Sequence, residues 1–136
     1  MIAQPEAPAP YALVVDDDAL LRMDVVDILS QAGFRTYEAR DADDAIDLLQ
    51  IKQASVVLIF SDVEMPGSRN GFELVREVAR CWPHIAIVVA SGRMKPGPDD
   101  MPEGARFIGK PFSVATIHHH IQEILPDGQK PKPLKS

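Results

Sequence analysis

Three consecutive carboxylates end the first apolar run of the chain. In the stretch LVVDDD, Asp16, Asp17 and Asp18 follow directly after Val15. Carboxylates this close together raise one another's pKa unless a cation neutralises them. Mg²⁺ prefers oxygen ligands of this kind and keeps several of its waters when it binds. The run is therefore either part of a magnesium site or an ordinary solvated turn in which Asp18 caps the next helix.

Other polar residues follow later apolar runs in the same way. Asp62 ends the run LIFSD, Ser91 follows IAIVVA, and Lys110 lies in FIGKPF. If these runs are parallel strands of one sheet, their carboxyl ends meet at the edge where ligands bind in open α/β folds. Carboxylates, a divalent cation and a lysine at one edge would suit transfer of a phosphoryl group to an aspartate. Each residue alone has an ordinary structural explanation, but such explanations do not account for the shared edge.

The elements that must position these residues alternate between strand-like and helix-like patterns. Strands are predicted at YALVV, FRTYEA, SVVLIF, IAIVVA and ARFIG. Helices are predicted over residues 19–32, 41–50 and 71–81 and from Ser113 onward, with Asp41 and Ser113 as N-caps. This alternation predicts an α/β fold, a doubly wound five-stranded parallel sheet with helices on both faces.

The helical spacing also predicts which side chains are buried. Cys81, at the end of the third predicted helix, is expected to be buried and unreactive, because no basic neighbour in the sequence activates it. One face of the first helix is apolar and is expected to pack on the sheet. Its members are Leu21, Val25, Ile28 and Leu29.

The segment between the fourth and fifth predicted strands lacks a helical pattern. Residues Ser91–Gly104, SGRMKPGPDDMPEG, contain three glycines and three prolines, which interrupt helices. We therefore expect the fourth helix of the doubly wound fold to be shortened or replaced by a loop. Because this glycine-hinged loop joins two strand ends at the predicted site, a further hypothesis is that it moves when the site changes state.

Composition limits the classes of protein to consider. The chain has 136 residues and is expected to form one domain over residues 11–125, with proline-rich disordered tails at 1–10 and 126–136. A net charge of −6 argues against nucleic acid as a direct partner. No stretch has the roughly 20 apolar residues of a membrane helix, and the N-terminus does not resemble a signal peptide. With a single cysteine, a cytoplasmic setting is expected.

The ordered motifs VVDDD, SDVEMPG, SG and KPF resemble the response-regulator receiver domains of two-component signalling. The resemblance covers nearly all of Tyr11–Leu125 and implies a flavodoxin-like strand order, 2-1-3-4-5. It implies that Asp62 accepts a phosphoryl group from a sensor histidine kinase or a histidine phosphotransfer protein. It also implies that Asp16 and Asp17 hold Mg²⁺ together with Asp62 and the backbone carbonyl of Glu64.

Further roles follow from the same resemblance. Lys110 would pair with the phosphoryl oxygens, Pro111 would follow it in a cis peptide, and Phe107 stands where the family has its switch aromatic. The family usually has Thr or Ser at the end of the fourth strand to bond the phosphoryl group. Here Ala90 or Ser91 takes that place, depending on the register, and Ser91 is the candidate with a hydroxyl.

Two functions from different classes fit these residues. The first is a stand-alone, phosphorylation-switched signalling module rather than an enzyme, whose output is binding to another protein. The second is a Mg²⁺-dependent phosphohydrolase of the haloacid-dehalogenase type, with Asp16 as nucleophile and Asp18 as acid/base. The second would leave Asp62 without a role, so the signalling module is preferred.

Overall fold

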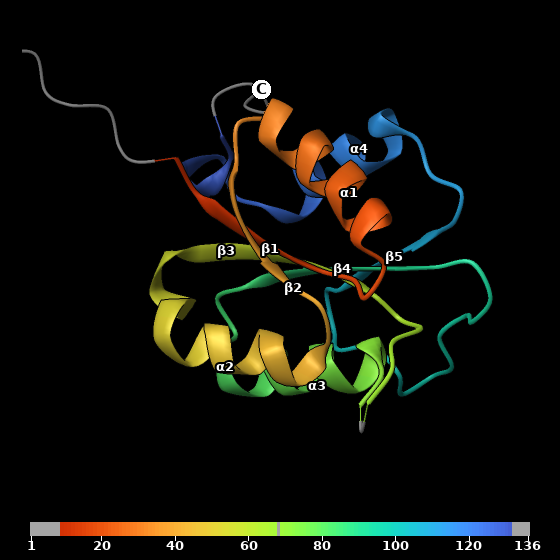
Figure 1. Cartoon of the computed structure of the whole chain (residues 1–136). Coiled ribbons are helices and arrows are strands. Elements are labelled where there is room, and N and C mark those ends of the chain that lie inside the picture. The colour runs from red at the N-terminus through yellow and green to blue at the C-terminus, as the bar shows by residue number, and fades with distance from the viewer. Residues whose placement is uncertain (1–8, 68, 132–136) are drawn as a thin grey trace, which may run out of the picture.

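A computed structural model describes residues 9–67 and 69–131, which form a five-stranded parallel sheet between two layers of helices (Figure 1). The strand order β2-β1-β3-β4-β5 confirms the predicted topology. The strands are β1 (Tyr11–Val15), β2 (Arg35–Ala39), β3 (Val56–Asp62), β4 (Ala86–Ser91) and β5 (Arg106–Gly109). The helices are α1 (Ala19–Gln31), α2 (Ala42–Lys52), α3 (Gly71–Cys81) and α4 (Val114–Ile124). Short 3₁₀ turns lie at η1 (Gln53–Ser55) and η2 (Asp127–Gln129).

Both faces of the sheet are covered, which explains the continuous apolar runs of its central strands. Along β3, Ile59 packs into the cluster shared with α2 and α3. Its neighbours Leu58 and Phe60 point the other way, into the cluster shared with α1 and α4. Alternate side chains of one strand therefore hold two separate cores together.

Helix starts follow the predicted capping residues. Asp18 accepts hydrogen bonds from the backbone of Leu20 and Leu21 and so caps α1. Asp41 and Ser113 cap α2 and α4 as predicted. The predicted apolar face of α1 is wrong at one position, because Leu21 is 43% exposed. Its helical turn borders a cavity at the sheet edge.

Cys81 also differs from expectation. It was predicted to be buried but is exposed. Its position as the last residue of α3 explains the difference, because the buried face of this helix consists of residues earlier in its sequence. The buried members are Gly71, Phe72, Leu74, Val75 and Val78.

No helix joins β4 to β5, as the glycine and proline content predicts. The connecting residues run as a loop that packs on the same face of the sheet as α2 and α3, where Met101 and Ala105 contact the core. The Arg76 side chain on α3 donates a hydrogen bond of 3.1 Å to the carbonyl oxygen of Asp100. The far half of the loop is thereby fixed to α3.

The described structure continues past Leu125, where the domain was predicted to end. Residues 126–131, expected to begin a disordered tail, contain η2 and the buried residues Lys130 and Pro131. The Lys130 ammonium lies 2.9 Å from the Asp127 carboxylate, and its backbone amide bonds to the carbonyl oxygen of Pro126. These local bonds give the segment a packed turn. Residues 1–8 and 132–136, the rest of both predicted tails, lie outside the described residues.

Candidate functional site

Three carboxylates converge where β1 and β3 end. Ligand oxygens of Asp16, Asp17 and Asp62 all lie within 4.8 Å of one another. Asp16 and Asp62 are 5% and 6% exposed, whereas Asp17 faces solvent. The donors are all oxygens and one side is open to water, which suits a hard cation such as Mg²⁺. The structure thus brings together the three aspartates that the sequence placed at one edge.

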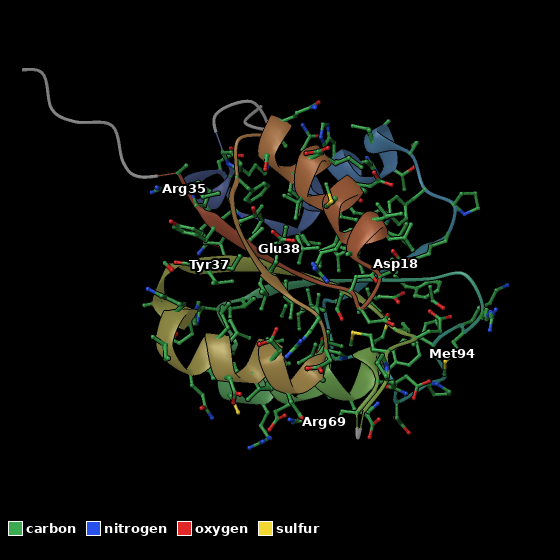
Figure 2. The ribbon with its side chains drawn as sticks, in the orientation of Figure 1. Asp18, Arg35, Tyr37, Glu38, Arg69 and Met94 are labelled. Atoms are coloured by element: carbon green, nitrogen blue, oxygen red, sulfur yellow. The ribbon has the colours of Figure 1, made fainter. Side chains whose placement is uncertain are left out.

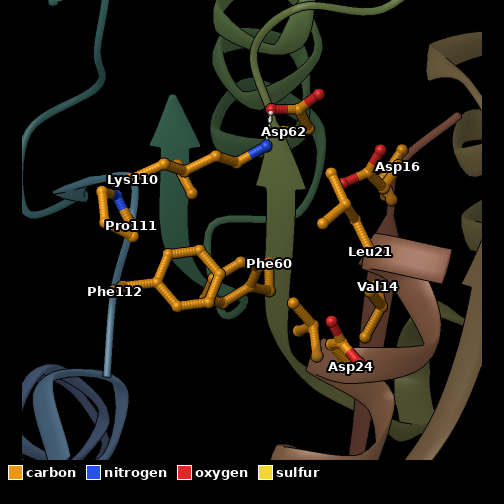
Figure 3. A pocket seen from close by; sticks show the side chains of 12 residues that line it. Val14, Asp16, Leu21, Asp24, Phe60, Asp62, Lys110, Pro111 and Phe112 are labelled. Atoms are coloured by element: carbon orange, nitrogen blue, oxygen red, sulfur yellow. Dashed lines mark hydrogen bonds and ion pairs between the residues drawn. The ribbon is translucent and has the colours of Figure 1, made fainter. Parts of the chain in front are cut away.

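Lys110 completes the charged cluster from the end of β5. Its ammonium lies 2.8 Å from Oδ1 of Asp62, as the dashed line in Figure 3 marks. The peptide bond between Lys110 and Pro111 is cis, as expected. The backbone amide of Lys110 donates a 2.9 Å bond to the carbonyl oxygen of Ser91, which ties the lysine to the end of β4.

Burial sets the protonation behaviour of the cluster. Burial raises the pKa of Asp62 to about 6, although the hydrogen bond and charge of Lys110 oppose this, while Asp16 and Glu64 add to the increase. Burial likewise raises the pKa of Asp16, against the bond from the backbone of Asp18. Burial alone would lower the pKa of Lys110, but the contact with Asp62 outweighs it and raises that pKa. The site is thus short of positive charge, which a divalent cation would supply.

Arg22 fixes the backbone that carries Asp16. Its guanidinium donates a 2.7 Å bond to the carbonyl oxygen of Asp16 and a 3.0 Å bond to the Glu38 carboxylate. Glu38 belongs to β2, and Figure 2 shows it beside α1. Sequence reasoning did not find Arg22, because its partners are set by the packing of α1 on β2 rather than by any local pattern.

The loop that follows Asp62 is held at its far end by α3. Gly71 begins α3, and its amide bonds to the carbonyl oxygen of Val63 at 2.9 Å. A Cβ on Gly71 would lie 2.0 Å from the carbonyl oxygen of Asp62, so only glycine fits there. The N-cap Asn70 and Glu73 form a capping box that fixes this helix start. Sequence reasoning placed Gly71 at a helix start but missed its contact with Asp62.

The register of β4 decides which residue faces the site. Ala90 pairs with Asp62 and lines the cavity beside it. Ser91 does not line that cavity, because its side chain turns away and donates a 2.5 Å bond to the Glu64 carboxylate. Ala90 is therefore the β4 residue beside Asp62, and the hydroxyl of Ser91 is bonded to Glu64.

Glu64 links the loop after β3 to the loop after β4. Besides Ser91, its carboxylate accepts bonds from the backbone amides of Arg93 and Met94, at 3.1 and 3.3 Å. Partial burial alone would raise the pKa of Glu64, but these hydrogen bonds, led by the one from Ser91, lower it. The carboxylate is therefore an anion held among three donors. This role of the Glu64 side chain was not predicted, because only its backbone carbonyl was expected to act.

A cavity of about 410 Å³ opens beside the charged cluster (Figure 3). One side carries Asp16, Asp62 and Lys110, and the remainder is mostly apolar. Phe60 and Phe112 meet edge-to-face in its wall, with ring centroids 5.8 Å apart. The cavity is also lined by Val14, Val15, Leu21, Asp24, Val25, Ala90 and Pro111.

Phe107 lies apart from this cavity. It is half-buried on β5 and pairs with Val89, on the strand next to it. The expected switch aromatic is therefore on the last strand of the sheet but not among the residues that line the cavity.

Most of the chain matches one known protein family. The family described as the response regulator receiver domain matches residues 12–122. The chain belongs to this family. As a receiver domain of two-component systems it is a signalling module, and the order of its strands is the one this family resemblance implied.

The receiver domain makes up very different shares of its named relatives. It is 28% identical to the chemotaxis protein CheY of Thermotoga maritima over 116 residues, which cover 82% of the chain and 94% of that protein. It is 32% identical to the transcriptional regulatory protein PdtaR of Mycobacterium tuberculosis over 114 residues, covering 77% of the chain and 51% of PdtaR. The match to the sensor kinase CckA of Brucella abortus, 29% identical, covers 83% of the chain and 12% of that kinase. The receiver domain thus spans only about half of PdtaR and a smaller part of CckA.

Solved structures agree with the fold of the receiver domain. The chemotaxis protein CheY4 of Vibrio cholerae is 27% identical, with a TM-score of 0.74 over 87% of the chain and 100% of CheY4. The receiver domain of NtrX from Brucella abortus is 32% identical, with a TM-score of 0.71 over 84% of the chain and 97% of its own. Within residues 9–67 and 69–131, no helix is long and apolar enough to cross a membrane.

Proposed function

We propose that this receiver domain accepts a phosphoryl group on Asp62 from a sensor histidine kinase or a histidine phosphotransfer protein. The observation that carries the proposal is the placing of Asp62, buried at a strand end, 2.8 Å from the Lys110 ammonium and clustered with two further aspartates. A nucleophilic carboxylate beside a fixed cation and a metal-binding carboxylate pair is the arrangement that phosphoryl transfer to an aspartate requires.

Asp16, Asp17, Asp62 and the backbone carbonyl of Glu64 would hold Mg²⁺. The donor set fits this ion, because the carboxylates are within 4.8 Å of one another and none of their neighbours in the cluster is a thiol or imidazole. Bound there, the ion would neutralise the aspartates and draw charge from the phosphoryl oxygens.

The protein's own groups then have distinct tasks. Lys110 bonds to Oδ1 of Asp62 and so fixes the orientation of the carboxylate that would attack phosphorus. With a phosphohistidine donor, a P–O bond forms on Asp62 while the P–N bond breaks, and the departing imidazole takes up a proton. The Lys110 ammonium is then close enough to pair with the phosphoryl oxygens. The Asp18 amide bonds to the Asp16 carboxylate, and Arg22 bonds to the Asp16 carbonyl oxygen. These bonds hold Asp16 in the position from which it would bind the metal.

The surface beside the site supports a protein as the phosphodonor. Three large apolar side chains of α1 are exposed, Leu20 at 74%, Leu21 at 43% and Met23 at 57%, and Leu21 lines the cavity. Such a group is suited to contact with an apolar face of another protein. We expect the output to be protein binding too, in the cytoplasm, without direct contact to nucleic acid, since the chain carries a net charge of −6.

Two observations count against the hydrolase alternative. Asp18, its acid/base, is occupied as the N-cap of α1, where it accepts bonds from Leu20 and Leu21. Asp62, which that chemistry would leave without a role, has the ammonium partner instead. Nothing therefore favours Asp16 as the nucleophile over Asp62.

The test is intact mass after incubation with Mg²⁺ and a small-molecule phosphodonor. The parent chain should gain one phosphoryl group, and Asp62→Asn should gain none. Asp24→Asn is the matched control, because Asp24 lines the same cavity without belonging to the metal cluster, so it should behave as the parent. Phosphorylation that persists in Asp62→Asn would place the nucleophile elsewhere and overturn the proposal.

A further inference from the structure

One arginine joins the loop after Asp62 to two helices. Arg69 lies in the loop between β3 and α3, directly before the N-cap Asn70. Its guanidinium lies 2.6 Å from the Asp43 carboxylate, in the first turn of α2, and also pairs with the Glu77 carboxylate of α3. We name these two ion pairs the Arg69 clamp. Figure 2 shows Arg69 on the side of the sheet that carries α2 and α3.

The Arg69 clamp differs from a single exposed ion pair, which contributes little to stability. The side chains of Arg69 and Glu77 are only 29% and 28% exposed. The hydrogen bond to the Asp43 carboxylate, together with the charge of Glu77, raises the pKa of Arg69, although burial opposes this. The planar guanidinium has donors on two sides and so bonds to both carboxylates at once. One charged group thus ties together three segments of the chain.

The Arg69 clamp is connected to the phosphoryl-acceptor residue through the start of α3. Asn70, the neighbour of Arg69, caps this helix, and Gly71 packs against the carbonyl oxygen of Asp62. The Gly71 amide also bonds to the carbonyl oxygen of Val63 at 2.9 Å, so the loop begins and ends at the same point. A shift of the loop end would therefore move the backbone beside Asp62.

The same loop carries the carbonyl group that was assigned to the metal. Glu64 lies two residues after Asp62, so two of the proposed ligands belong to one short piece of backbone. Met65 anchors the first part of the loop in the core shared with α2 and α3. Arg69 anchors its last part to the surfaces of the same two helices. The position of both ligands thus depends on how the loop is held.

We propose that Arg69 is a positioning residue: the Arg69 clamp holds the β3–α3 loop against α2 and so keeps Asp62 and the Glu64 carbonyl where they would bind Mg²⁺. This inference rests on the proposed function, and it adds a residue that lies outside the metal cluster. Charge and position predict opposite results when Arg69 is removed. Loss of a cation alone would strengthen Mg²⁺ binding, whereas loss of an anchor for the ligands weakens it.

The test combines Mg²⁺ titration calorimetry with amide hydrogen exchange of the metal-free full chain. Arg69→Lys keeps the charge but loses the planar fork that holds both carboxylates, so we expect about tenfold weaker Mg²⁺ binding. Arg69→Met should weaken binding at least as much, although it removes a cation. In both variants the Gly71 amide should exchange about tenfold faster, as expected for a lost bond between charged groups.

The partner on α2 gives a second variant. Asp43→Asn removes the acceptor charge at the other end of the 2.6 Å contact and should resemble Arg69→Lys in both measurements. Combined with Arg69→Met, it should add nothing further, because both changes remove the same interaction. Additive losses of Mg²⁺ affinity in the double variant would mean that the two residues act separately, which would overturn the Arg69 clamp.

Two controls separate positioning from charge and from general stability. Arg80→Met removes an equal charge that pairs with Glu77 at 3.6 Å from within α3 itself, so it should behave as the parent. The Leu125 amide, bonded to the carbonyl oxygen of Ile121 at the end of α4, should exchange at the same rate in every sample.

The outcomes that would overturn the inference are distinct from those that would overturn the proposed function. Mg²⁺ binding as tight as in the parent, or tighter, in Arg69→Lys and Arg69→Met would overturn the positioning role. Equally faster exchange at Gly71 and Leu125 would do the same, because it would signal a general loss of stability. Absence of Mg²⁺ binding and of any phosphoryl gain in the parent would overturn the proposed function, and the positioning role with it, even where exchange at Gly71 confirms the clamp.

Discussion

The Cα of Gly71 faces the carbonyl oxygen of Asp62 so closely that an added Cβ would lie 2.0 Å from that oxygen. It would also lie 2.8 Å from the Cα of Val63. The start of α3 thus rests directly against the backbone of the phosphoryl-acceptor residue. The atoms in contact belong to the main chain, so no flexible side chain can move aside to relieve the overlap.

Gly71→Ala should therefore displace Asp62 and destabilise the fold. Overpacking of this kind costs about 1–3 kcal/mol, and we expect a value near the upper end because backbone must shift. Urea unfolding measures the loss of stability, and intact mass with a phosphodonor measures the loss of phosphorylation. Gly109→Ala is the control, since a Cβ there meets nothing within 4 Å. Equal stability of the two variants would contradict the contact.

The stability of the metal-free protein should fall as the pH rises from about 4 to about 6. The pKa of Asp62 is raised from 3.8 to about 6 by folding, so the folded state binds more protons than the unfolded state in this window. The stabilisation from a neutral Asp62 is complete below pH 4 and lost above pH 6, by up to about 3 kcal/mol.

Comparison with Asp62→Asn isolates this contribution. Unfolding free energies from urea titrations with a chelator, between pH 4 and 7, should show the parent losing stability relative to the variant as the pH rises. The change of this difference with pH reports the titration of Asp62, because the variant has no carboxyl group at this position. A difference that stays constant across the window would mean that folding does not raise the pKa of Asp62.

Replacing Lys110 by methionine should raise the pKa of Asp62 above about 6. The hydrogen bond and the charge of Lys110 are the two influences that lower this pKa, while burial and two neighbouring carboxylates raise it. Carboxyl carbon NMR of the metal-free protein measures the titration directly. Lys52→Met, at the exposed end of α2, should leave the titration of Asp62 as it is in the parent. An unchanged or lower pKa in Lys110→Met would contradict the role given to the ion pair.

Ala90→Thr should place a hydroxyl beside the phosphoryl group. Ala90 pairs with Asp62 and borders a cavity of about 410 Å³, so two added heavy atoms have room. We expect Mg²⁺-dependent affinity for beryllofluoride to increase about tenfold, the effect of one hydrogen bond to a charged group. Ala90→Val has the same shape without the donor. If both variants bind the mimic equally well, filling the cavity, not the hydroxyl, is responsible.

Much of this arrangement is present in the local sequence. Period-two and period-3.6 patterns specify the strands and helices, and the topology of a parallel sheet then brings Asp16, Asp62 and Lys110 to one edge. The loop in place of a fourth helix follows from its glycines and prolines. These features need only neighbours in sequence and the general handedness of the fold.

What the sequence could not supply depends on side-chain direction in three dimensions. Whether Ala90 or Ser91 faces the site is a matter of one residue of register, which reverses the face of every side chain. The contacts of Arg22 with β2 and of Gly71 with Asp62 join elements whose separation is set by packing. Leu21 is exposed because it borders the cavity at the sheet edge instead of packing against the sheet. Helical periodicity cannot show where such a cavity begins.

Both ends of the described chain lie at the edge of the sheet where strands begin. Pro10 bonds to the first residue of β2, and Pro126 and Gln129 border a cavity with Ile85 and Ala86, where β4 begins. The phosphoryl-acceptor site lies where the strands finish. A fluorophore, surface tether or second polypeptide joined at either end would therefore emerge from the opposite pole of the molecule. Immobilised in this way, the domain would present its acidic rim and the exposed side of α1 freely to a partner in solution.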